Sequence, residues 1–289
     1  MVELNDGAAN SAETDVLNCH VINLADNPVR LNHIIKTFGD ADISFTRFDA
    51  VDRTRAVDHP LAKLLPSMKV RPLSPGELGC LLSHYQIWKI VECATDDFAA
   101  VFEDDAVIDP RLRTVLSERS FFPTDADLIK LETVNYPVQL GLVSSPAPYG
   151  MEYRRLLSQH KGTCGYIISR KAATYLVSSL HMFDGPIDEV LFSPDHPMSK
   201  NLTIYQIVPA MVVQDCRNPI RSMRDPNLNT TLYRERLGAF SPQGNLIQRA
   251  IRKLVRFYVS RRFSPVPFDN TNMKTELVEF SSVDGSQSR

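Results

Sequence analysis

Three consecutive carboxylates are the residues best suited to chemistry. The apolar stretch 98–102 runs straight into Glu103, Asp104 and Asp105. Such a run is typical of a strand buried on both faces of a sheet. In an extended chain Glu103 and Asp105 project to one side and Asp104 to the other. Acids that repel one another at the end of a strand either bind Mg²⁺ or Mn²⁺, which prefer oxygen ligands, or form a solvated acidic turn.

A second group of candidate residues lies on a predicted helix. Ser74-Pro75-Gly76-Glu77 is a capping box with proline in the first turn. Apolar residues then recur at helical spacing as Leu78, Leu81, Leu82, Tyr85, Trp88 and Val91, which predicts a core face. His84 lies two turns beyond Glu77, so the two share another face. A single histidine on a helix is more often structural than functional, and both interpretations stay open at this point.

The elements that would position these residues begin with a strand over 19–24. Asp26 or Asn27 caps a helix that has Pro28 in its first turn and stops at Gly39, and a second strand follows over 45–50. Strand, helix and strand in this order are typical of α/β domains. The sequence contains neither Gly-x-Gly-x-x-Gly nor Gly-Lys-Ser/Thr, which excludes a dinucleotide fingerprint and a phosphate loop.

Later elements carry a second pair of acids. The sequence predicts a buried strand over 127–131, a long loop-like stretch over 133–160, a glycine-rich turn into a strand over 162–168 with a helix capped by Ser169, and late strands over 204–208 and 210–213. Pro186 would start a short helix with Asp188 and Glu189 in its first turn. Acids at that position also simply complement the helix dipole.

Composition narrows the class of protein. The 289 residues carry a net charge of −2, which gives no sign of a nucleic-acid partner. Five scattered cysteines form no Cys-x-x-Cys pair, so we expect reduced thiols rather than a zinc site or a disulfide framework. The polar start lacks the pattern of a signal peptide, and no apolar run approaches the ~20 residues that span a bilayer. We therefore expect a cytoplasmic protein.

Four segments are expected along the chain. They are a disordered lead-in over 1–16, a catalytic domain over 17–216, an extension over 217–264 and a polar tail over 265–289. Within the extension, 245–263 holds six basic and no acidic residues between apolar ones. Such a basic amphipathic helix either lies on an anionic membrane surface or packs on the domain with a solvated basic face.

Seven short segments, taken in order along the chain, resemble a known family. They are 21–24 with Arg30, 48–52, 73–80, 83–88, 101–105, 162–169 and 186–188. Over roughly residues 17–215 they resemble the family 25 glycosyltransferases, bacterial enzymes of lipopolysaccharide or lipooligosaccharide biosynthesis, many of them galactosyltransferases. The resemblance implies a GT-A-like single α/β domain with a mostly parallel central sheet flanked by helices.

The resemblance also implies a reaction and its residues. The donor would be a UDP-sugar, most often UDP-galactose, with Mn²⁺ or Mg²⁺ held by Glu103 and Asp105. Asp104 would instead bind the ribose or the sugar. The remaining donor-site candidates are Asn23, Arg30, Glu77 and His84, although Arg30 could equally be an ordinary surface charge. An inverting transfer needs a base on the acceptor hydroxyl, for which Asp188 is the first candidate and Glu189 the second.

The expected acceptor is a lipid-linked glycan. The enzyme would then work in the cytoplasm, held at the inner face of the bacterial inner membrane by the basic segment 245–263. Two other functions fit part of the pattern. Buried acids with Mg²⁺ also serve phosphoester hydrolysis, and an inactive relative would only bind glycolipid or membrane.

Overall fold

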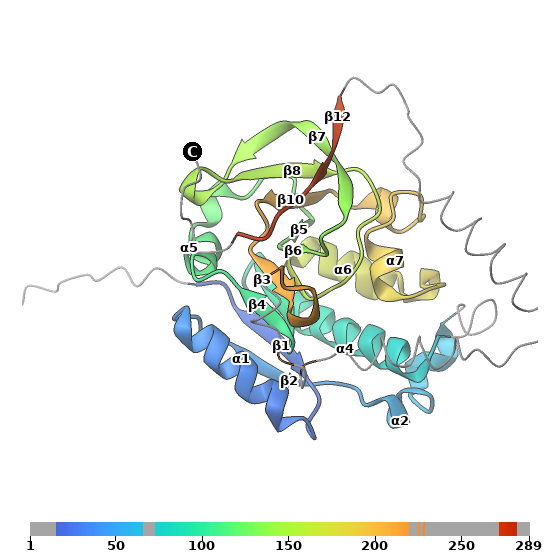
Figure 1. Cartoon of the computed structure of the whole chain (residues 1–289). Helices are drawn as coiled ribbons and strands as arrows, with labels where there is room; N and C mark the ends of the chain where they lie inside the picture. The colour runs from blue at the N-terminus through green and yellow to red at the C-terminus, as the bar shows by residue number, and fades with distance from the viewer. Residues whose placement is uncertain (1–15, 66–72, 220–224, 226–227, 229–271, 282–289) are drawn as a thin grey trace, which may run out of the picture.

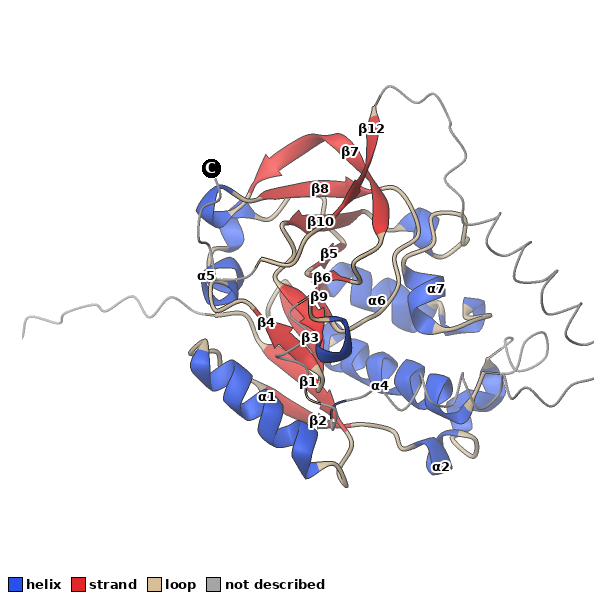
Figure 2. Cartoon of the chain, viewed as in Figure 1, coloured by secondary structure: helices blue, strands red, loops and turns tan. Residues whose placement is uncertain are grey.

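A computed structural model describes residues 16–65, 73–219, 225, 228 and 272–281. This part of the chain has an α/β fold built on a nine-stranded sheet, with strands in the order β12-β7-β8-β10-β5-β9-β3-β1-β2 (Figure 1). A smaller sheet of the order β4-β11-β6 lies beside it. Helices flank the large sheet (Figure 2).

The elements have the following bounds. The large sheet contains β1 Cys19–Asn23, β2 Thr46–Asp49, β3 Phe98–Glu103, β5 Leu128–Lys130, β7 Pro137–Pro146, β8 Glu152–Leu156, β9 Gly165–Ser169, β10 Ile204–Val208 and β12 Met273–Leu277. The small sheet contains β4 Ala106–Ile108, β6 Glu132–Thr133 and β11 Val212–Gln214. The α-helices are α1 Pro28–Asp40, α2 Arg53–Ala56, α4 Pro75–Glu92, α5 Leu112–Ser117, α6 Arg170–Ser178 and α7 Ile187–Leu191.

Strand β3 is buried on both faces, as its apolar run predicts. Ala99 and Val101 point into the core cluster formed with α4 and α6, whereas Ala100 and Phe102 point into the cluster formed with α1 and α5. Figure 1 accordingly shows α1 and α4 on opposite sides of β1 and β3. Successive side chains of a strand face opposite ways, so an uninterrupted apolar run fits a strand covered on both sides.

The large sheet is mixed, and the expectation of a mostly parallel sheet is wrong. Strand β1 pairs in parallel with β2 and β3, and β10 with β5. Strand β9 is inserted antiparallel between β3 and β5, and the pairs β10·β8, β7·β8 and β12·β7 are antiparallel as well. The parallel part is therefore confined to β2-β1-β3 and β5-β10.

The predicted loop over 133–160 is also wrong, because most of it forms strands β7 and β8. Pro137 and Pro146 are the first and last residues of β7. At a strand end the missing N–H of proline need not break a hydrogen bond of the sheet, so proline is tolerated there. The prolines that suggested a loop therefore mark the limits of a strand.

Helix α4 begins as its capping box predicts. The Ser74 hydroxyl accepts a hydrogen bond from the Glu77 backbone N–H at 3.2 Å, and the Glu77 carboxylate accepts one from the Ser74 N–H at 2.9 Å. The predicted apolar face is buried. A side chain at Gly79 would come within 2.5 Å of the Val51 carbonyl oxygen, so glycine lets α4 approach the loop that follows β2.

The C-terminal part of the chain differs from the predicted polar tail. Residues 273–277 form β12, which pairs antiparallel with β7. Arg154 of β8 forms an ion pair of 2.5 Å with Glu276. The basic segment 245–263 lies outside the described residues, as does most of the lead-in 1–16. Within the described part of the chain, every helix is too short or too polar to span a bilayer.

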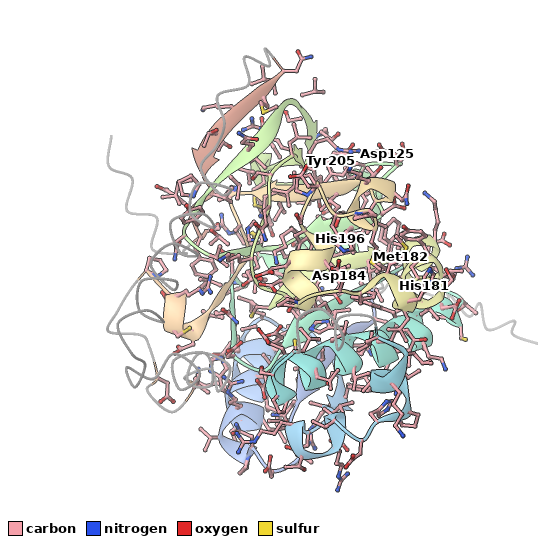
Figure 3. The ribbon with its side chains drawn as sticks, turned by 90° about the vertical axis from the view of Figure 1, so that its right-hand side faces the viewer. Asp125, His181, Met182, Asp184, His196 and Tyr205 are labelled. Carbon is pink, nitrogen blue, oxygen red and sulfur yellow. The ribbon has the colours of Figure 1, made fainter. Side chains whose placement is uncertain are left out.

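Two contacts join neighbouring segments on the side of the molecule that Figure 3 shows. His196 Nε2 lies 3.1 Å from Asp184 Oδ1, which joins the loops on either side of α7. The Tyr205 hydroxyl donates to Asp125 Oδ1 at 2.8 Å, which joins β10 to the loop before β5.

Candidate functional site

Several of the predicted site residues meet at the carboxyl ends of the parallel strands β1 and β3. Strands β1 and β3 are parallel, so their carboxyl ends, Asn23 and Glu103, lie at the same edge. Strand β9 runs the other way, and the turn before it, which contains Thr163, therefore reaches this edge too. Ligands of open α/β sheets bind beyond the carboxyl ends of parallel strands, which is where these residues gather.

Arg30 links the first helix to the carboxylates. Its guanidinium lies 2.5 Å from Asp104 Oδ1 and 3.1 Å from Asp105 Oδ2, and it also donates to the Leu228 carbonyl at 2.9 Å. Asn23 donates to Asp104 Oδ2 at 2.7 Å. The structure thus brings Asn23, Arg30 and Asp104 together, and Arg30 is no ordinary surface charge.

The carboxylates carry more negative charge than Arg30 neutralises. Burial, together with the charges of Glu103, Asp104 and Glu132, raises the pKa of Asp105 to about 7 against the opposing charge of Arg30. Burial raises the pKa of Asp104 as well, again against Arg30. A pKa raised by burial and like charge marks a site that favours an added cation.

Glu103 points toward helix α4. The Thr163 hydroxyl donates to its Oε1 at 2.5 Å, and His84 Nε2 lies 3.5 Å from the same oxygen. Burial tends to raise the pKa of Glu103, but the contacts with His84 and Thr163 outweigh it and lower this pKa. The second nitrogen of His84, Nδ1, lies 2.8 Å from the hydroxyl of Tyr166.

Of the remaining candidates, one lies near the carboxyl ends of β1 and β3 and one has a structural role. Asp188 Oδ2 accepts a hydrogen bond from the Gly162 N–H at 3.1 Å, one residue before Thr163. Asp188 therefore reaches the same turn as Glu103. The Glu77 carboxylate caps α4, which is a structural role. Glu189 is half-buried beside Asp188 on α7.

Sequence reasoning missed a buried ion pair that contacts the turn before β9. Lys130 and Glu132 are both fully buried, and Lys130 Nζ donates to Glu132 Oε2 at 2.8 Å and to the Gly162 carbonyl. The Cys164 N–H donates to Glu132 Oε2 at 2.9 Å, while Oε1 has no hydrogen-bond partner among the described residues. The available signal was a lysine inside the apolar strand 127–131, because lysine is rarely buried without a partner.

Gly162 is required at this turn. Its φ is +79°, a conformation that residues with a side chain rarely adopt, and an added Cβ would overlap Glu132 Oε1. Its N–H and C=O hold Asp188 and Lys130 respectively. One peptide segment therefore joins the buried ion pair to the candidate base.

The residues present suit a hard divalent cation. Asp104, Asp105 and Glu132 are buried carboxyls with raised pKa values, and Glu132 Oε1 lacks a partner among the described residues. Oxygen donors of this kind are the ligands of Mg²⁺ and Mn²⁺. The excess of carboxylate over guanidinium and ammonium groups thus fits a bound cation.

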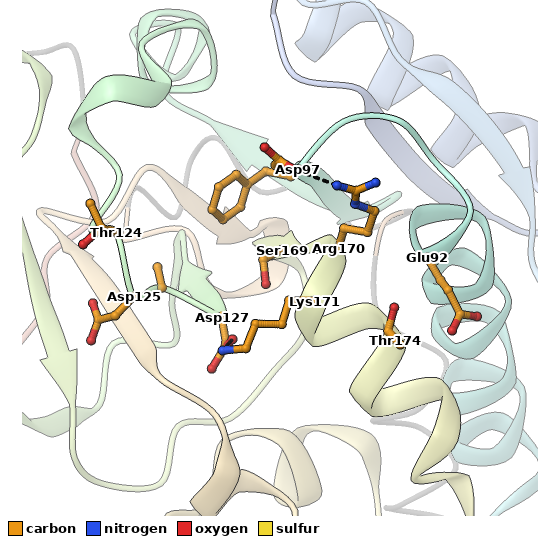
Figure 4. A pocket seen from close by; sticks show the side chains of 11 residues that line it. Glu92, Asp97, Thr124, Asp125, Asp127, Ser169, Arg170, Lys171 and Thr174 are labelled. Atoms are coloured by element: carbon orange, nitrogen blue, oxygen red, sulfur yellow. Dashed lines mark hydrogen bonds and ion pairs between the residues drawn. The ribbon is translucent and has the colours of Figure 1, made fainter.

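A cavity at the other end of β3 is separate from this site. It has a volume of about 590 Å³ and includes Phe98, the first residue of β3, whereas the carboxylates follow the last (Figure 4). Two of its cations are paired, Arg170 with Asp97 at 2.8 Å and Lys171 with Asp127 at 3.0 Å. Four carboxylates and two cations line this cavity, and it is its position at the opposite end of β3 that separates it from the site.

Comparisons with known proteins agree with the resemblance. Residues 16–191 match the family model described as glycosyltransferase family 25 (LPS biosynthesis protein). The lacto-N-neotetraose biosynthesis glycosyltransferase LgtB of Neisseria meningitidis serogroup A is 34% identical over 208 residues, which cover 68% of this chain and 74% of that protein.

Other relatives extend the same pattern. The LgtB protein of N. meningitidis serogroup B is 31% identical over 82% of this chain and 92% of its own. The lipooligosaccharide biosynthesis protein lic2B of Haemophilus influenzae is 29% identical over 68% of this chain and 75% of its own. The family match and these relatives together show that the chain belongs to glycosyltransferase family 25.

Proposed function

We propose that this protein transfers a hexose, most simply galactose, from a UDP-sugar to a lipid-linked lipopolysaccharide or lipooligosaccharide glycan. The observation that carries the proposal is the buried, carboxylate-rich site with Arg30 at the carboxyl ends of β1 and β3. The printed roles of the relatives, in lacto-N-neotetraose and lipooligosaccharide biosynthesis, support the glycan acceptor.

The donor would bind across the carboxyl ends of β1 and β3. Asp105, with Glu103, would hold Mn²⁺ or Mg²⁺, which neutralises the charge that develops on the diphosphate leaving group. Arg30 already faces both Asp104 and Asp105, so its guanidinium can turn to a phosphate oxygen without crossing the site. Asn23 orients Asp104, which is then placed to accept from the ribose or the sugar.

Asp188 is the proposed base. In an inverting transfer one carboxylate takes the proton of the attacking hydroxyl while the diphosphate leaves. The Gly162 N–H fixes Asp188 Oδ2, and the next residue along the chain, Thr163, holds Glu103. The base and the donor carboxylates are therefore positioned by one turn, and Glu189 is the second candidate on the same helix.

The location of the enzyme forms part of the proposal. A lipid-linked acceptor would place it in the cytoplasm at the inner face of the inner membrane. The basic segment 245–263 has the charge pattern for an anionic lipid surface.

The test is sugar transfer from a panel of UDP-hexoses to truncated lipooligosaccharide acceptors, with Mn²⁺ or with a chelator. We expect transfer of one sugar that depends on the metal and is lost in Asp105→Ala. Folded protein that transfers no sugar in any combination would contradict the proposal and favour a glycolipid-binding role. Phosphate release that needs no acceptor would instead favour a phosphoester hydrolase.

A further inference from the structure

Helix α4 and strand β3 bring together three side chains with metal-binding atoms. A ligand atom of Cys80, of His84 and of Glu103 lie within 4.8 Å of one another. Cys80 and His84 are four residues apart on α4, so they share a face of the helix. Glu103 ends β3 and faces them from the sheet.

The histidine atom in this cluster lacks a hydrogen bond. His84 is fully buried, and its Nε2 has no hydrogen-bond partner within the described residues. The 3.5 Å to Glu103 Oε1 exceeds the 2.7–3.2 Å range of a good N–H···O bond. A buried polar atom without a partner is costly, and a bound ion between His84 and Glu103 would remove that cost.

The other side of the histidine ring is fixed as in many metal sites. His84 Nδ1 lies 2.8 Å from the Tyr166 hydroxyl, and the Trp88 indole N–H donates to the same hydroxyl at 2.9 Å. Metal-binding histidines usually have their second nitrogen hydrogen-bonded, which sets the ring orientation and leaves the first nitrogen for the ion. Here that arrangement aims Nε2 at Glu103.

We propose that Cys80, His84 and Glu103 form a site for a borderline-soft divalent ion, Zn²⁺ in the first instance. Thiolate, imidazole and carboxylate are the ligands that Zn²⁺ combines, with a fourth position left for water or substrate. Zinc bond lengths place such ligand atoms about 3.5 Å apart, so a small side-chain adjustment closes the cluster. The pair Cys80 and His84, spaced by one helical turn, has no Cys-x-x-Cys signature to reveal it.

This site lies beside the hard-cation site proposed at Asp105 and shares Glu103 with it. The thiol of Cys80 favours Zn²⁺ over Mn²⁺ or Mg²⁺. Occupation by Zn²⁺ would hold Glu103 against α4 and leave Asp105 as the main ligand for the donor's metal. The proposal does not rest on the identity of the sugar or of the acceptor.

The direct test is titration of the purified full chain, with any affinity tag removed, with Co²⁺ as a spectroscopic substitute for Zn²⁺. We expect one equivalent of Co²⁺ to give thiolate-to-cobalt charge-transfer absorption that Zn²⁺ abolishes and equimolar Mn²⁺ does not. Cys80→Ser should remove this absorption and weaken binding at least tenfold. The matched control is Cys93→Ser, which changes the exposed cysteine just beyond α4 and should leave the absorption intact.

A second measurement needs no variant. Zn²⁺ should slow alkylation of Cys80 by iodoacetamide at least tenfold, as mapped by mass spectrometry, while alkylation of Cys93 keeps its rate. Absence of the Co²⁺ absorption in the wild type, or equal protection of both cysteines, would overturn the zinc site. Sugar transfer is scored separately with Mn²⁺, so loss of transfer with the Co²⁺ absorption intact counts against the proposed function and not against this site.

Discussion

Two aspartates and one arginine set the electrostatics of the site at the scale of single residues. Asp104 and Asp105 share the Arg30 guanidinium, and burial raises the pKa of both carboxyls in spite of it. A bound metal ion and the diphosphate would add charges of both signs here. In the proposed reaction Arg30 would then exchange a carboxylate for a phosphate oxygen, and donor binding would be coupled to the ordering of the acids.

The candidate base gives the first prediction. Asp188→Asn should lower sugar transfer by about 10²–10⁴-fold, because a general base contributes that much, while the dissociation constant of the UDP-sugar stays unchanged. Transfer kinetics and donor calorimetry would measure the two quantities. Asp184→Asn, an exposed carboxylate on the loop before α7, is the matched control. Near-normal turnover of Asp188→Asn would pass the role to Glu189.

A buried histidine gives a prediction about pH. Burial, with a smaller contribution from Lys130, holds the pKa of His160 well below 6.5, so the folded protein keeps it neutral. Below pH 6.5 the unfolded chain binds a proton that the folded chain does not, and stability is therefore lost as the pH falls. His160→Gln should remove about 1.4 kcal/mol per pH unit of this loss, as urea unfolding at a series of pH values below 6.5 would measure.

An equal pH dependence in wild type and His160→Gln would contradict this account. It would mean that His160 titrates alike in the folded and unfolded chain. The T-shaped contact of its ring with Phe192, at a centroid separation of 6.4 Å, would then tolerate the charged ring.

Helix α4 is the element on which the zinc proposal depends. It carries His84 and Cys80 toward Glu103, and its apolar face packs against α6 and α7 in the core cluster. Its first turn is fixed by Ser74 and Glu77. A change at the cap therefore reaches the site through the position of the helix.

The capping box gives the prediction at this scale. Ser74→Ala should lower the free energy of unfolding by about 1 kcal/mol, because the Glu77 N–H loses its acceptor. Chemical denaturation would measure the change. Ser178→Ala, whose hydroxyl donates to the Tyr175 carbonyl at the exposed end of α6, is the control and should change stability less. A neutral Ser74→Ala would show that tertiary packing alone fixes the start of α4.

Local signals explain which elements the sequence predicts well. The apolar run of β3 and the caps of α1, α4 and α6 are encoded within a few neighbouring residues, and the structure confirms all of them. The sequence predicts a loop where β7 and β8 form because prolines dominate the local signal, and the strands that flank this hairpin, β12 and β10, lie far along the chain. The antiparallel insertion of β9 between β3 and β5 is non-local in the same way.

The site shows the same division. The acidic run could be found because its members are adjacent, but the contact of Arg30 with Asp104 spans 74 positions and has no local signature. The link between Glu103 and the Cys80–His84 pair also arises only when β3 packs beside α4. The residue types indicate the chemistry, but long-range packing determines which residues come together in the site.

At the scale of the whole molecule, a late strand completes the sheet. Strand β12 covers the edge of β7, and the residues after it return to the small sheet and its surroundings. The Thr133 hydroxyl donates to the Val278 carbonyl at 2.6 Å, and Ala210 exchanges backbone hydrogen bonds of 2.9 and 2.8 Å with Glu279 and Ser281. The chain end therefore fastens the two sheets together.

Ending the chain at residue 271 should therefore destabilise the protein by several kcal/mol. Each lost hydrogen bond costs on the order of 1 kcal/mol, and an uncovered β7 edge favours aggregation. Thermal melting and light scattering would measure both effects. A chain ended at Ser281 keeps every contact just named and is the control. If the protein that ends at residue 271 has the same melting temperature as the full chain and stays monodisperse, β12 is dispensable.

The central claim is that the carboxylates beyond β3 bind the sugar nucleotide, and donor calorimetry tests it most directly. A UDP-sugar would be titrated, with and without Mn²⁺, into wild type, Asp105→Ala and Asp125→Ala, the last of these lying at the cavity beside the opposite end of β3. We predict metal-dependent binding to wild type and Asp125→Ala, and at least about tenfold weaker binding, a loss of about 1.4 kcal/mol, to Asp105→Ala. Equal binding to all three proteins, or loss of binding only in Asp125→Ala, would contradict the account.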